Sequence, residues 1–378
     1  MHPDIRARLP IGIDARAAAE VPAGRGRYVR ELLTALERLP EAASERFSLF
    51  AREPWGDLDP ERFRWVLIDL PDPLWHLAAA WRANRTTRAF LSTNSYLTAW
   101  FTRVPTGVVV YDLVPFIDGA HAQARAARIE KATIRPALRR ASVLPCISNA
   151  TRDDLERLFP TSRGKTVVTP LAADASFTAP VDRPGHPDLT RPYVLAVGTL
   201  EPRKNLERLL DAWLKLDPAV RARFDLALVG ARGWEDDGIV GKAEAAEVRL
   251  LGRVSDPELR ALYAGASAFA YPSLYEGFGL PPLEAMAAGA PVLTSNLSSL
   301  PEVVGDAAVQ VDPHDTDAIA HGLERLLTDD ALATRLRDAG RARAAGFTWD
   351  RTAASTLEAL RSASRRPGFS YGAEPGTS

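Results

Sequence analysis

Short apolar stretches that alternate with helical stretches constrain the fold of this 378-residue chain more than any other feature. The apolar run 11–15 precedes residues 24–39, where Tyr28, Leu32 and Leu36 recur at helical spacing. Such alternation predicts a mostly parallel sheet covered by helices. Further strands are predicted at 47–51, 65–70, 107–112, 142–148 and 166–169, with helices at 122–140 and 150–158.

A proline-rich stretch at 178–188 interrupts the alternation, and its three prolines and one glycine are typical of a linker. The pattern then restarts, with strands predicted at 193–198, 224–230, 248–251, 268–271 and 291–294, and helices at 206–216, 257–264, 282–288 and 350–364. We therefore predict an α/β fold of two doubly wound, Rossmann-like domains, a final helix that packs back on the first domain, and a disordered tail. Their ranges are 1–185, 186–348, 349–365 and 366–378.

Composition narrows the class of protein. The hydrophobic fraction of 46% and charged fraction of 25% are those of an ordinary globular protein. The net charge of −1 argues against a nucleic-acid-binding role. No signal peptide or apolar run long enough to span a membrane is evident, and the single cysteine, Cys146, lies in a predicted buried strand. These features predict a cytoplasmic protein.

The charge is unevenly distributed along the chain. Residues 1–190 hold 26 Lys+Arg and 22 Asp+Glu, and the total of 47 and 48 leaves 21 and 26 for the rest, so the halves carry +4 and −5. Chance scatter explains this difference, and so does an N-terminal domain that approaches an anionic acceptor or the inner face of a membrane. Both interpretations stay open at this point.

Ligands of parallel α/β sheets bind beyond the carboxyl ends of the strands, so the turns after strands are the candidate sites. The turn at 23–28 places Gly24 and Gly26 before a helix, where backbone amides can meet an anion. A tight structural connection explains the same pattern, and the third glycine of a dinucleotide fingerprint is absent. This turn alone is a weak signal.

A second turn follows the strand at 193–198 and carries adjacent cations. Gly198 ends the strand, and Arg203 and Lys204 precede Asn205 and a helix. An arginine fork and a mobile lysine together suit a diphosphate. The alternative is a pair of solvated loop residues.

A third turn, at 271–286, holds two glutamates around a glycine loop. Glu276 follows the strand, and Glu284 is expected in the first turn of the next helix, so that both face one cleft. Gly277 and Gly279 leave amides open to phosphate or sugar oxygens, and carboxylates accept paired hydrogen bonds from vicinal hydroxyls. Glu284 also has a structural explanation, as an acidic residue near a helix N-terminus.

The blocks Tyr-Glu-Gly-Phe-Gly-Leu-Pro-Pro-Leu-Glu-Ala-Met from Tyr275, Gly-Thr-Leu-Glu-Pro-Arg-Lys-Asn-Leu from Gly198, Ile-Gly-Ile-Asp-Ala-Arg from Ile11 and Ser-Asn-Ala-Thr-Arg-Asp-Asp-Leu from Ser148 occur in this order. Together they resemble the retaining glycosyltransferases of family 4, which have the two-domain GT-B fold, and in particular their mannosyltransferase-like group of polysaccharide assembly. The match spans nearly the whole chain.

The resemblance implies roles for individual residues. Arg203 and Lys204 would hold the donor diphosphate, Glu276 would contact the transferred sugar, and Glu284 would bind the nucleotide ribose. The first three are the implied catalytic residues. The other implied substrate-binding positions are Gly24, Gly26, Tyr111, Asp112, Gly198, Asn205, Gly252, Val254, Gly277, Phe278, Gly279 and Leu280.

One position departs from the family pattern. Many relatives have His-Asp after the strand at 108–110, where this chain has Tyr111-Asp112. A tyrosine hydroxyl can hydrogen-bond a sugar, but it cannot serve as an imidazole. The resemblance therefore does not define the donor-sugar contact from this domain.

The predicted function is retaining, metal-independent transfer of a hexose from a nucleotide sugar to a glycan or lipid-linked acceptor. Cationic side chains would stabilise the leaving diphosphate, no acidic pair suited to a divalent metal is evident, and no cofactor is expected. A dehydrogenase should show a complete glycine fingerprint, and a phosphorylase a pyridoxal-phosphate lysine motif. A non-catalytic sugar-nucleotide or glycan-binding protein remains the alternative.

The donor and acceptor are less constrained. The family resemblance favours GDP-mannose over UDP- or dTDP-sugars. Five tryptophans gather in the N-terminal half near three arginines, and we expect core packing for most of them, with sugar stacking or a peripheral membrane contact as alternatives. These residues are Trp55, Trp65, Trp75, Trp81 and Trp100, and Arg82, Arg85 and Arg88.

Overall fold

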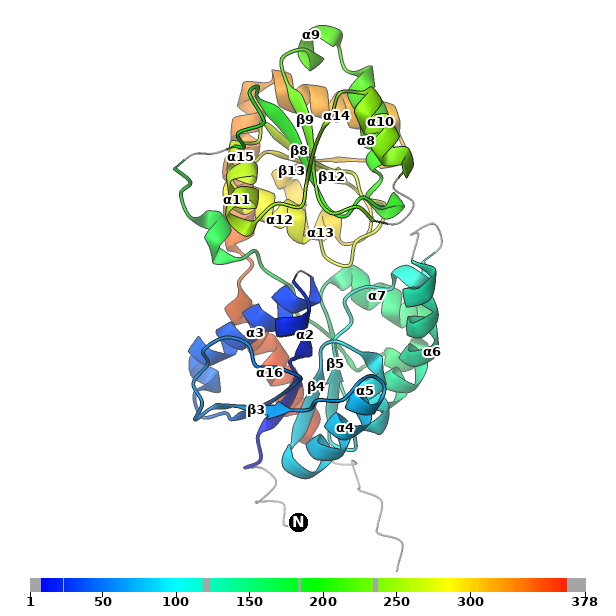
Figure 1. The fold of residues 1–378 in the computed structure, drawn as a ribbon, viewed down its shortest axis with the longest axis vertical. Helices are drawn as coiled ribbons and strands as arrows, with labels where there is room; N and C mark the ends of the chain where they lie inside the picture. The colour runs from blue at the N-terminus through cyan, green and yellow to red at the C-terminus, as the bar shows by residue number, and fades with distance from the viewer. Residues whose placement is uncertain (1–7, 23, 118–122, 183–184, 234–236, 366–378) are drawn as a thin grey trace, which may run out of the picture. The chain divides into compact units, whose positions relative to one another are not determined.

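The computed structural model describes residues 8–22, 24–117, 123–182, 185–233 and 237–365. The chain divides into two units, which are described separately (Figure 1). Unit 1 comprises residues 1–111, 128–170 and 349–378, and unit 2 comprises residues 112–127 and 171–348. The predicted disordered tail at 366–378 lies outside the described residues. Among the described residues, no helix is long and apolar enough to cross a membrane.

Unit 1 is built on a parallel sheet with the strand order β3-β2-β1-β4-β5. The short pair β6-β7 continues it through parallel bridges from Gly107 to Val143 and from Val110 to Cys146. The central strands are buried on both faces, which explains their continuous apolar runs. The strands are β1 (Ile11–Asp14), β2 (Phe47–Ala51), β3 (Phe63–Leu67), β4 (Ala89–Ser92), β5 (Thr106–Val108), β6 (Leu144–Cys146) and β7 (Thr166–Val168).

The helices of unit 1 include the last helix of the chain. Helix α16 packs against α3, β4 and β5, and Arg361 and Asp350 form ion pairs with Glu45 and Arg38 at 2.9 and 2.6 Å. These contacts place α16 in unit 1. The helices are α2 (Arg16–Glu20), α3 (Arg25–Arg38), α4 (Leu74–Thr86), α5 (Tyr96–Phe101), α6 (Ala124–Arg140), whose first residues belong to unit 2, α7 (Asn149–Leu158) and α16 (Trp349–Arg365).

Unit 2 holds a six-stranded parallel sheet in the order β10-β9-β8-β11-β12-β13. This is the doubly wound order, in which β9 and β10 are added on one side of β8 and β11, β12 and β13 on the other. Helices cover both faces (Figure 1). The strands are β8 (Tyr193–Val197), β9 (Asp225–Val229), β10 (Arg249–Gly252), β11 (Ala268–Tyr271), β12 (Val292–Ser295) and β13 (Ala308–Val311). The helices are α8 (Leu206–Lys215), α9 (Pro218–Arg221), α10 (Asp237–Ala245), α11 (Asp256–Gly265), α12 (Leu280–Ala288), α13 (Leu300–Val304), α14 (Thr316–Thr328) and α15 (Asp330–Ala345).

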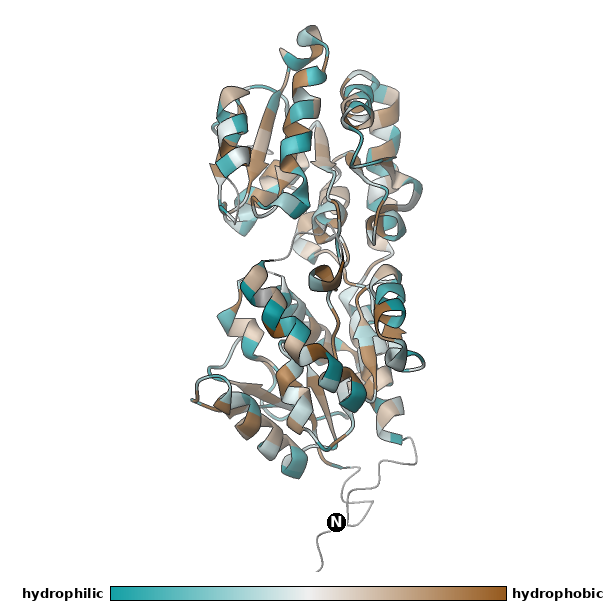
Figure 2. Ribbon diagram, turned by 90° about the vertical axis from the view of Figure 1, so that its right-hand side faces the viewer, coloured by the Kyte–Doolittle hydropathy of each residue, from teal (hydrophilic) through white to brown (hydrophobic). Residues whose placement is uncertain are grey.

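The core of unit 2 follows from the amphipathic pattern of its helices. Leu209 and Trp213 of α8 and Leu323 of α14 are buried with Val194 and Leu226 of the sheet. Figure 2 shows the same division in hydropathy, with brown strands inside and teal residues on the outward faces of helices. Burial of such a continuous apolar face supplies most of the stability of a helix in this setting.

The boundary between the units differs from the expected one. Contacts divide the chain between Pro170 and Leu171, whereas the proline-rich linker suggested residue 185. The reason is tertiary: Phe177 packs edge-on against Tyr263, with ring centroids 5.7 Å apart, and so draws its segment into unit 2. Residues 112–127 also belong to unit 2 by contacts, which a linear reading of the pattern does not reveal.

The expectation for the tryptophans is wrong for most of them. Trp75 is fully buried, but Trp81 is 56% exposed, and Trp55, Trp65 and Trp100 are half-buried. The expectation for the cysteine is confirmed, because Cys146 is buried in β6, where burial raises the pKa of its thiol to about 12.

Gly26 has a packing role that can be tested. A Cβ at this position would lie 1.7 Å from the carbonyl oxygen of Val21, where α2 and α3 meet. We expect Gly26→Ala to lower the free energy of unfolding by at least about 2 kcal/mol, because backbone would have to move. Gly241→Ala is the matched control: its Cβ meets open space on α10, so stability should stay the same or rise slightly. Urea unfolding measures both changes, and equal stability of the two variants would contradict the packing role.

Candidate active site

The candidate site lies at the carboxyl edge of the unit 2 sheet, between β8 and β11. These neighbouring strands run parallel, and β9 pairs with β8 on the side opposite β11. The connections leaving β8 and β11 therefore diverge at this edge, which is where α/β sheets of this order bind ligands. Both sequence-predicted loops, 198–205 and 271–280, begin here.

Asn205 ties the two loops together. It adopts a left-handed conformation, with φ of 57°, at the junction between a short 3-10 turn (Pro202–Lys204) and α8. Its buried Nδ2 donates to the carbonyl oxygens of Pro272 at 3.0 Å and Pro313 at 2.7 Å. Asn205 therefore joins the loop after β8 to the loop after β11, and the contact with substrate that the family resemblance implies stays a prediction.

Glu276 is the centre of a buried polar cluster. Its Oε2 lies 2.8 Å from Nη1 of Arg203, and its Oε1 lies 2.7 Å from Nζ of Lys204. The hydroxyls of Tyr271 and Ser273 also donate to Oε1, at 2.9 and 2.7 Å. The structure thus brings together the three predicted catalytic residues and adds two hydroxyls that sequence reasoning missed.

The cluster changes the protonation equilibria of its members. Burial raises the pKa of Glu276, but the charges of Arg203 and Lys204 and hydrogen bonds from Lys204 and Ser273 outweigh it and lower the pKa to about 2. Burial lowers the pKa of Lys204, and Glu276 offsets part of that effect. Burial and the charge of Glu276 raise the pKa of Tyr271 well above its ordinary value, so its hydroxyl stays a donor.

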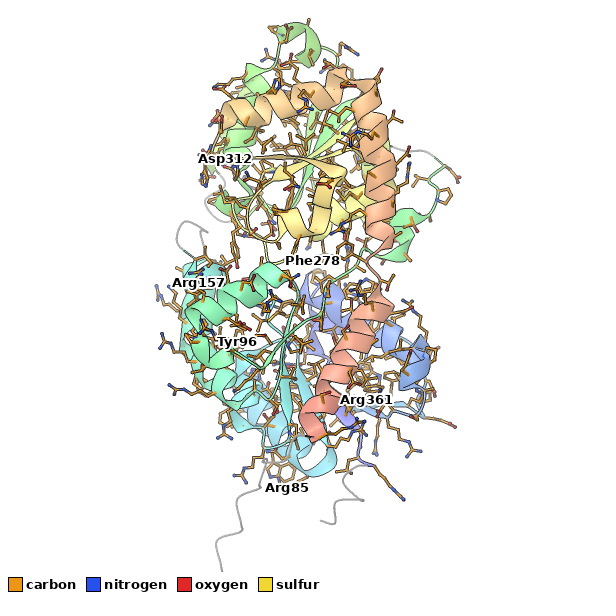
Figure 3. All side chains as sticks on the ribbon, turned by 180° about the vertical axis from the view of Figure 1, so that it is seen from behind. Arg85, Tyr96, Arg157, Phe278, Asp312 and Arg361 are labelled. Atoms are coloured by element: carbon orange, nitrogen blue, oxygen red, sulfur yellow. The ribbon has the colours of Figure 1, made fainter. Side chains whose placement is uncertain are left out.

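The glycine loop after β11 is held by two serines from a distant segment. Ser298 Oγ accepts a hydrogen bond from the Glu276 amide at 3.0 Å. Ser299 Oγ donates to the carbonyl oxygens of Glu276 and Phe278, at 2.9 and 2.7 Å. Both serines precede α13, and no local pattern in the sequence links them to the loop. Figure 3 labels Phe278 on this loop.

The loop leads directly into α12. Gly279, with φ of 109°, precedes Leu280, the first residue of the helix, and a Cβ at 279 would meet the side chain of Leu300 at 2.7 Å. Gly277 and Phe278 are buried, and the Phe278 ring packs edge-on against Phe347 at 5.8 Å. The backbone of this loop is therefore rigidly placed.

Glu284 occupies a different place from the expected one. The helix begins at Leu280, so Glu284 lies in its second turn and not in its first, and the helix-terminus explanation for its charge does not apply. It is buried, and its Oε2 accepts from the hydroxyl of Tyr263 at 3.3 Å. Its proposed contact with ribose stays a prediction.

The remaining unit 2 positions also lie at strand ends. Gly198 follows β8 with φ of 151°, and a Cβ there would crowd the Lys204 side chain at 3.3 Å. Gly252 ends β10, and Val254 follows it two residues later. Asp112 belongs to unit 2 by contacts and accepts a hydrogen bond from the Val114 amide at 3.1 Å.

Three predicted residues lie in unit 1. Gly24 is exposed at the start of α3 with φ of 55°, a conformation that favours glycine, and its contact with substrate stays a prediction. Gly26 is buried, and the close approach of the Val21 carbonyl oxygen, which leaves no room for a Cβ, explains the glycine at this position. The Tyr111 ring packs edge-on against Tyr28 at 5.3 Å, and its buried hydroxyl has no hydrogen-bond partner among the described residues.

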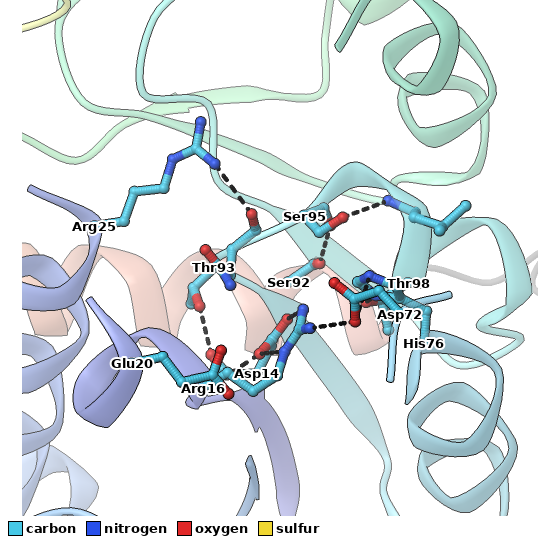
Figure 4. Close-up of polar contacts among 12 residues, drawn as sticks. Asp14, Arg16, Glu20, Arg25, Asp72, His76, Ser92, Thr93, Ser95 and Thr98 are labelled. Atoms are coloured by element: carbon cyan, nitrogen blue, oxygen red, sulfur yellow. Dashed lines mark hydrogen bonds and ion pairs between the residues drawn. The ribbon is translucent and has the colours of Figure 1, made fainter. Parts of the chain in front are cut away.

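A second polar cluster lies at the carboxyl end of β1 in unit 1 (Figure 4). Arg16 grips Asp14 with Nε and Nη2, at 3.1 and 3.0 Å, and its guanidinium carbon lies 3.6 Å from the Trp75 ring centre. His76 pairs with Thr98 at 2.7 Å, and burial followed by the charge of Arg16 lowers the pKa of His76 to about 4. These contacts stiffen the strand end.

Known proteins share both sequence and fold with this chain. Residues 181–343 match the family described as "Glycosyl transferases group 1". The O-antigen chain mannosyltransferase B of Escherichia coli is 35% identical over 319 residues, which cover 82% of this chain and 79% of that protein. The serotype-specific mannosyltransferase WbdA of Escherichia coli is 38% identical over 172 residues, covering 44% of this chain and 21% of WbdA.

A solved structure agrees in fold. Anabaena HepE, solved in complex with UDP and glucose, superposes with a TM-score of 0.72 at 16% identity, covering 94% of this chain and all of HepE. Together with the candidate site, these likenesses define the class: this chain is a glycosyltransferase with the GT-B fold. It belongs to the group 1 glycosyltransferases, family 4, with mannosyltransferases among its relatives. The predicted family, fold class and enzyme class are confirmed.

The depressed pKa of Glu276 predicts a pH-dependent contribution to stability. The folded carboxylate stays charged to lower pH than in the unfolded chain, where its pKa is near 4.5, so its contribution is complete above that pH and is lost as pH falls toward 2. At pH 7, Glu276→Gln should lower the free energy of unfolding by about 3 kcal/mol, because the largely buried Lys204 loses its carboxylate and Arg203 loses one of two.

The difference between wild type and this variant should shrink as pH falls from 4.5 toward 2, since protonated Glu276 resembles glutamine. Urea unfolding at several pH values measures it, and Glu244→Gln, at an exposed position on α10, is the control. A difference that stays constant down to the lowest pH would contradict the ion cluster.

Proposed function

We propose that this chain transfers a hexose from a nucleotide-diphosphate sugar to a glycan or lipid-linked acceptor, with retention of anomeric configuration and without a metal ion. The single observation that carries the proposal is the convergence of Arg203 and Lys204 on Glu276 at the carboxyl edge of the unit 2 sheet. Rupture of the anomeric bond leaves negative charge on the diphosphate and positive charge on the sugar ring. A site with both kinds of charge can stabilise both.

The two cations can accommodate the leaving group. Arg203 forms ion pairs with Glu276 and Glu201 and donates to the carbonyl oxygen of Tyr275. Lys204 forms an ion pair with Glu276 and donates to the hydroxyl of Tyr271. An ammonium has three N–H donors and a guanidinium has five, so both retain donors for phosphate oxygens. An incoming diphosphate would also favour the protonated form of Lys204, whose pKa burial lowers.

Glu276 fits an electrostatic role better than that of a covalent nucleophile. Both of its oxygens already bind cations or hydroxyls, and its pKa of about 2 marks a weakly basic carboxylate. In this proposal the charge of Glu276 orients the sugar and stabilises the oxocarbenium-like ring, and the acceptor attacks from the face that the diphosphate leaves. Glu284 binds the ribose in this proposal, and the turn with Gly252 and Val254 contacts the base.

The donor proposed first is GDP-mannose, ahead of UDP- and dTDP-sugars. Its support is that two sequence relatives are named as mannosyltransferases, one of them of the O-antigen chain. HepE, which shares only the fold, was solved with UDP and glucose, so UDP-sugars should be assayed as donors beside GDP-mannose. We place the reaction in the cytoplasm, which suits a buried, unpaired thiol such as Cys146.

Transfer should survive chelation. Because two cationic side chains face the diphosphate in this proposal, the rate measured with a labelled nucleotide sugar should be the same in EDTA as in Mg²⁺ or Mn²⁺. The control is a glycosyltransferase known to need a metal, assayed in the same buffers. Loss of transfer in EDTA that either metal ion restores would refute this part of the proposal.

Substitution of Glu276 should change the turnover rate, and substitution of Glu284 should change the affinity for nucleotide. Glu276→Gln should lower kcat by at least about 100-fold through weaker stabilisation of the transition state. Its binding of the nucleoside diphosphate should not weaken, because removal of the carboxylate leaves Arg203 and Lys204 to the phosphates. Glu284→Gln should weaken binding of donor and nucleoside diphosphate alike, by about tenfold, since a charged acceptor for the ribose is lost.

Calorimetric titration with the nucleoside diphosphate and turnover of the donor measure these effects. Circular dichroism confirms folding, and Glu244→Gln is again the control. If Glu276→Gln transfers sugar at the wild-type rate, the catalytic assignment is wrong. If Glu284→Gln binds nucleotide as the wild type does, the ribose assignment is wrong.

A further inference from the structure

One face of unit 1 exposes an unusual number of large apolar side chains. Six of the nine large hydrophobic residues that are exposed in the described part of the chain lie on β3, α4, α5 and the segment between β3 and α4. Trp81 and Leu74 are the most exposed of them, at 56% and 51%. We call this surface the α4 face, defined by Leu67, Leu70, Leu74, Leu77, Trp81 and Phe101.

The pattern along α4 explains the exposure. Leu74, Leu77 and Trp81 recur at helical spacing on one side, while Trp75 and Ala79 are buried on the other. The outward side of a helix that covers a sheet is normally polar, whereas α4 has apolar residues on both sides. Contiguous exposed apolar residues of this kind mark a surface that contacts another molecule or a membrane.

The charge beside Leu77, Trp81 and Phe101 is positive, whereas the Leu70 end of the α4 face also carries the exposed Asp69 and Asp72, of which Asp72 pairs with Arg52 at 2.9 Å. Residues 73–111 contain four arginines and no aspartate or glutamate. Arg88 pairs with Glu45, whereas Arg82, Arg85 and Arg103 are exposed and form no ion pair within the described residues. The Arg85 guanidinium carbon lies 4.0 Å from the Trp81 ring centre, and Figure 3 shows Arg85 at the margin of unit 1.

The apolar residues and arginines surround an open hollow of about 840 Å³. The end of α6 adds the exposed Arg140 to its wall. The amide of Asn84 is already used, because Nδ2 donates to the carbonyl oxygen of Phe101 at 3.0 Å and Oδ1 accepts from the Arg103 amide at 2.5 Å. The side-chain polar groups that remain are guanidinium groups, and none of the described residues that line the hollow is a carboxylate.

We propose that the α4 face docks unit 1 on the surface of an anionic phospholipid bilayer. The exposed tryptophan, leucines and phenylalanine would enter the interface between headgroups and acyl chains, while the arginines meet lipid phosphates. Sugar hydroxyls both donate and accept hydrogen bonds, whereas lipid phosphate only accepts, and the guanidinium groups of the hollow, which only donate, match phosphate better. A second copy of this chain would bring one cationic face against another, which is unfavourable.

The proposal is independent of the sugar-transfer mechanism, since none of its residues belongs to the candidate active site. It adds a partner, lipid of stated charge, that sets where the enzyme works. Transfer to a water-soluble acceptor should therefore proceed at the wild-type rate in variants of the α4 face, whereas their binding to vesicles should fall.

Sedimentation with vesicles tests the proposal. The full chain should bind phosphatidylcholine vesicles that contain phosphatidylglycerol, bind pure phosphatidylcholine vesicles weakly, and dissociate as salt is raised. Arg82→Gln with Arg85→Gln should lower partitioning by about fivefold for each arginine removed. Leu77→Ala with Trp81→Ala should lower it by more than about tenfold, because apolar surface no longer enters the bilayer.

Matched controls come from unit 2. Leu214→Ala removes an exposed leucine from α8, and Arg325→Gln with Arg335→Gln removes two exposed arginines from α14 and α15. These variants should bind vesicles as the wild type does. Circular dichroism and binding of nucleoside diphosphate verify that every variant is folded.

Three outcomes would overturn the proposal. Failure of the wild type to bind anionic vesicles is the first, and binding that the α4-face variants leave unchanged is the second. The third is a concentration-dependent dimer, seen by analytical ultracentrifugation, that Leu77→Ala with Trp81→Ala abolishes, because a second copy would then be the occupant of this face.

Discussion

Two largely buried cations share the Glu276 carboxylate at the edge of the unit 2 sheet, and the loops after β8 and β11 meet at this charge balance. Without Glu276, Lys204 would lose its carboxylate beside Arg203, which would keep only its ion pair with Glu201 at 2.5 Å, and this loss is costly at a largely buried site. The same pairing that stabilises the free protein keeps the cations where a diphosphate would need them. Tyr271 and Ser273 then fix the direction of the carboxylate.

The glycine loop depends on contacts that are distant in sequence. Ser298 and Ser299 hold the backbone of Glu276 and Phe278, and Asn205 holds the loop after β8 to Pro272. A loop with two glycines, Gly277 and Gly279, would otherwise lose much conformational entropy when a ligand orders it. Prior ordering by these side chains lowers that cost and fixes the direction of the loop amides.

Unit 1 has a polar cluster at one strand end and an exposed apolar surface on α4. Its polar cluster at Asp14 and Arg16 stiffens the carboxyl end of β1, at the edge where a parallel sheet binds ligands, while α4 exposes apolar and cationic residues on its outward side. Helix α4 can both pack against this polar cluster and expose apolar residues to solvent, because different residues form its inward and outward sides. Trp75 packs inward over Arg16, and Trp81 points to solvent six positions later.

The sequence alone predicted the α/β class, most of the strands and the three residues that form the ion cluster, because these follow from apolar periodicity and from short motifs within one loop. It placed the unit boundary at residue 185, assigned most tryptophans to the core, put Glu284 one turn too early, and gave no sign of Ser298 and Ser299. Each of these depends on which segments meet in space: Phe177 against Tyr263, α4 against the sheet, and the start of α13 against the glycine loop. Local pattern specifies elements and motifs, whereas tertiary packing decides their partners, because hydrogen bonds and burial act between residues far apart in the chain.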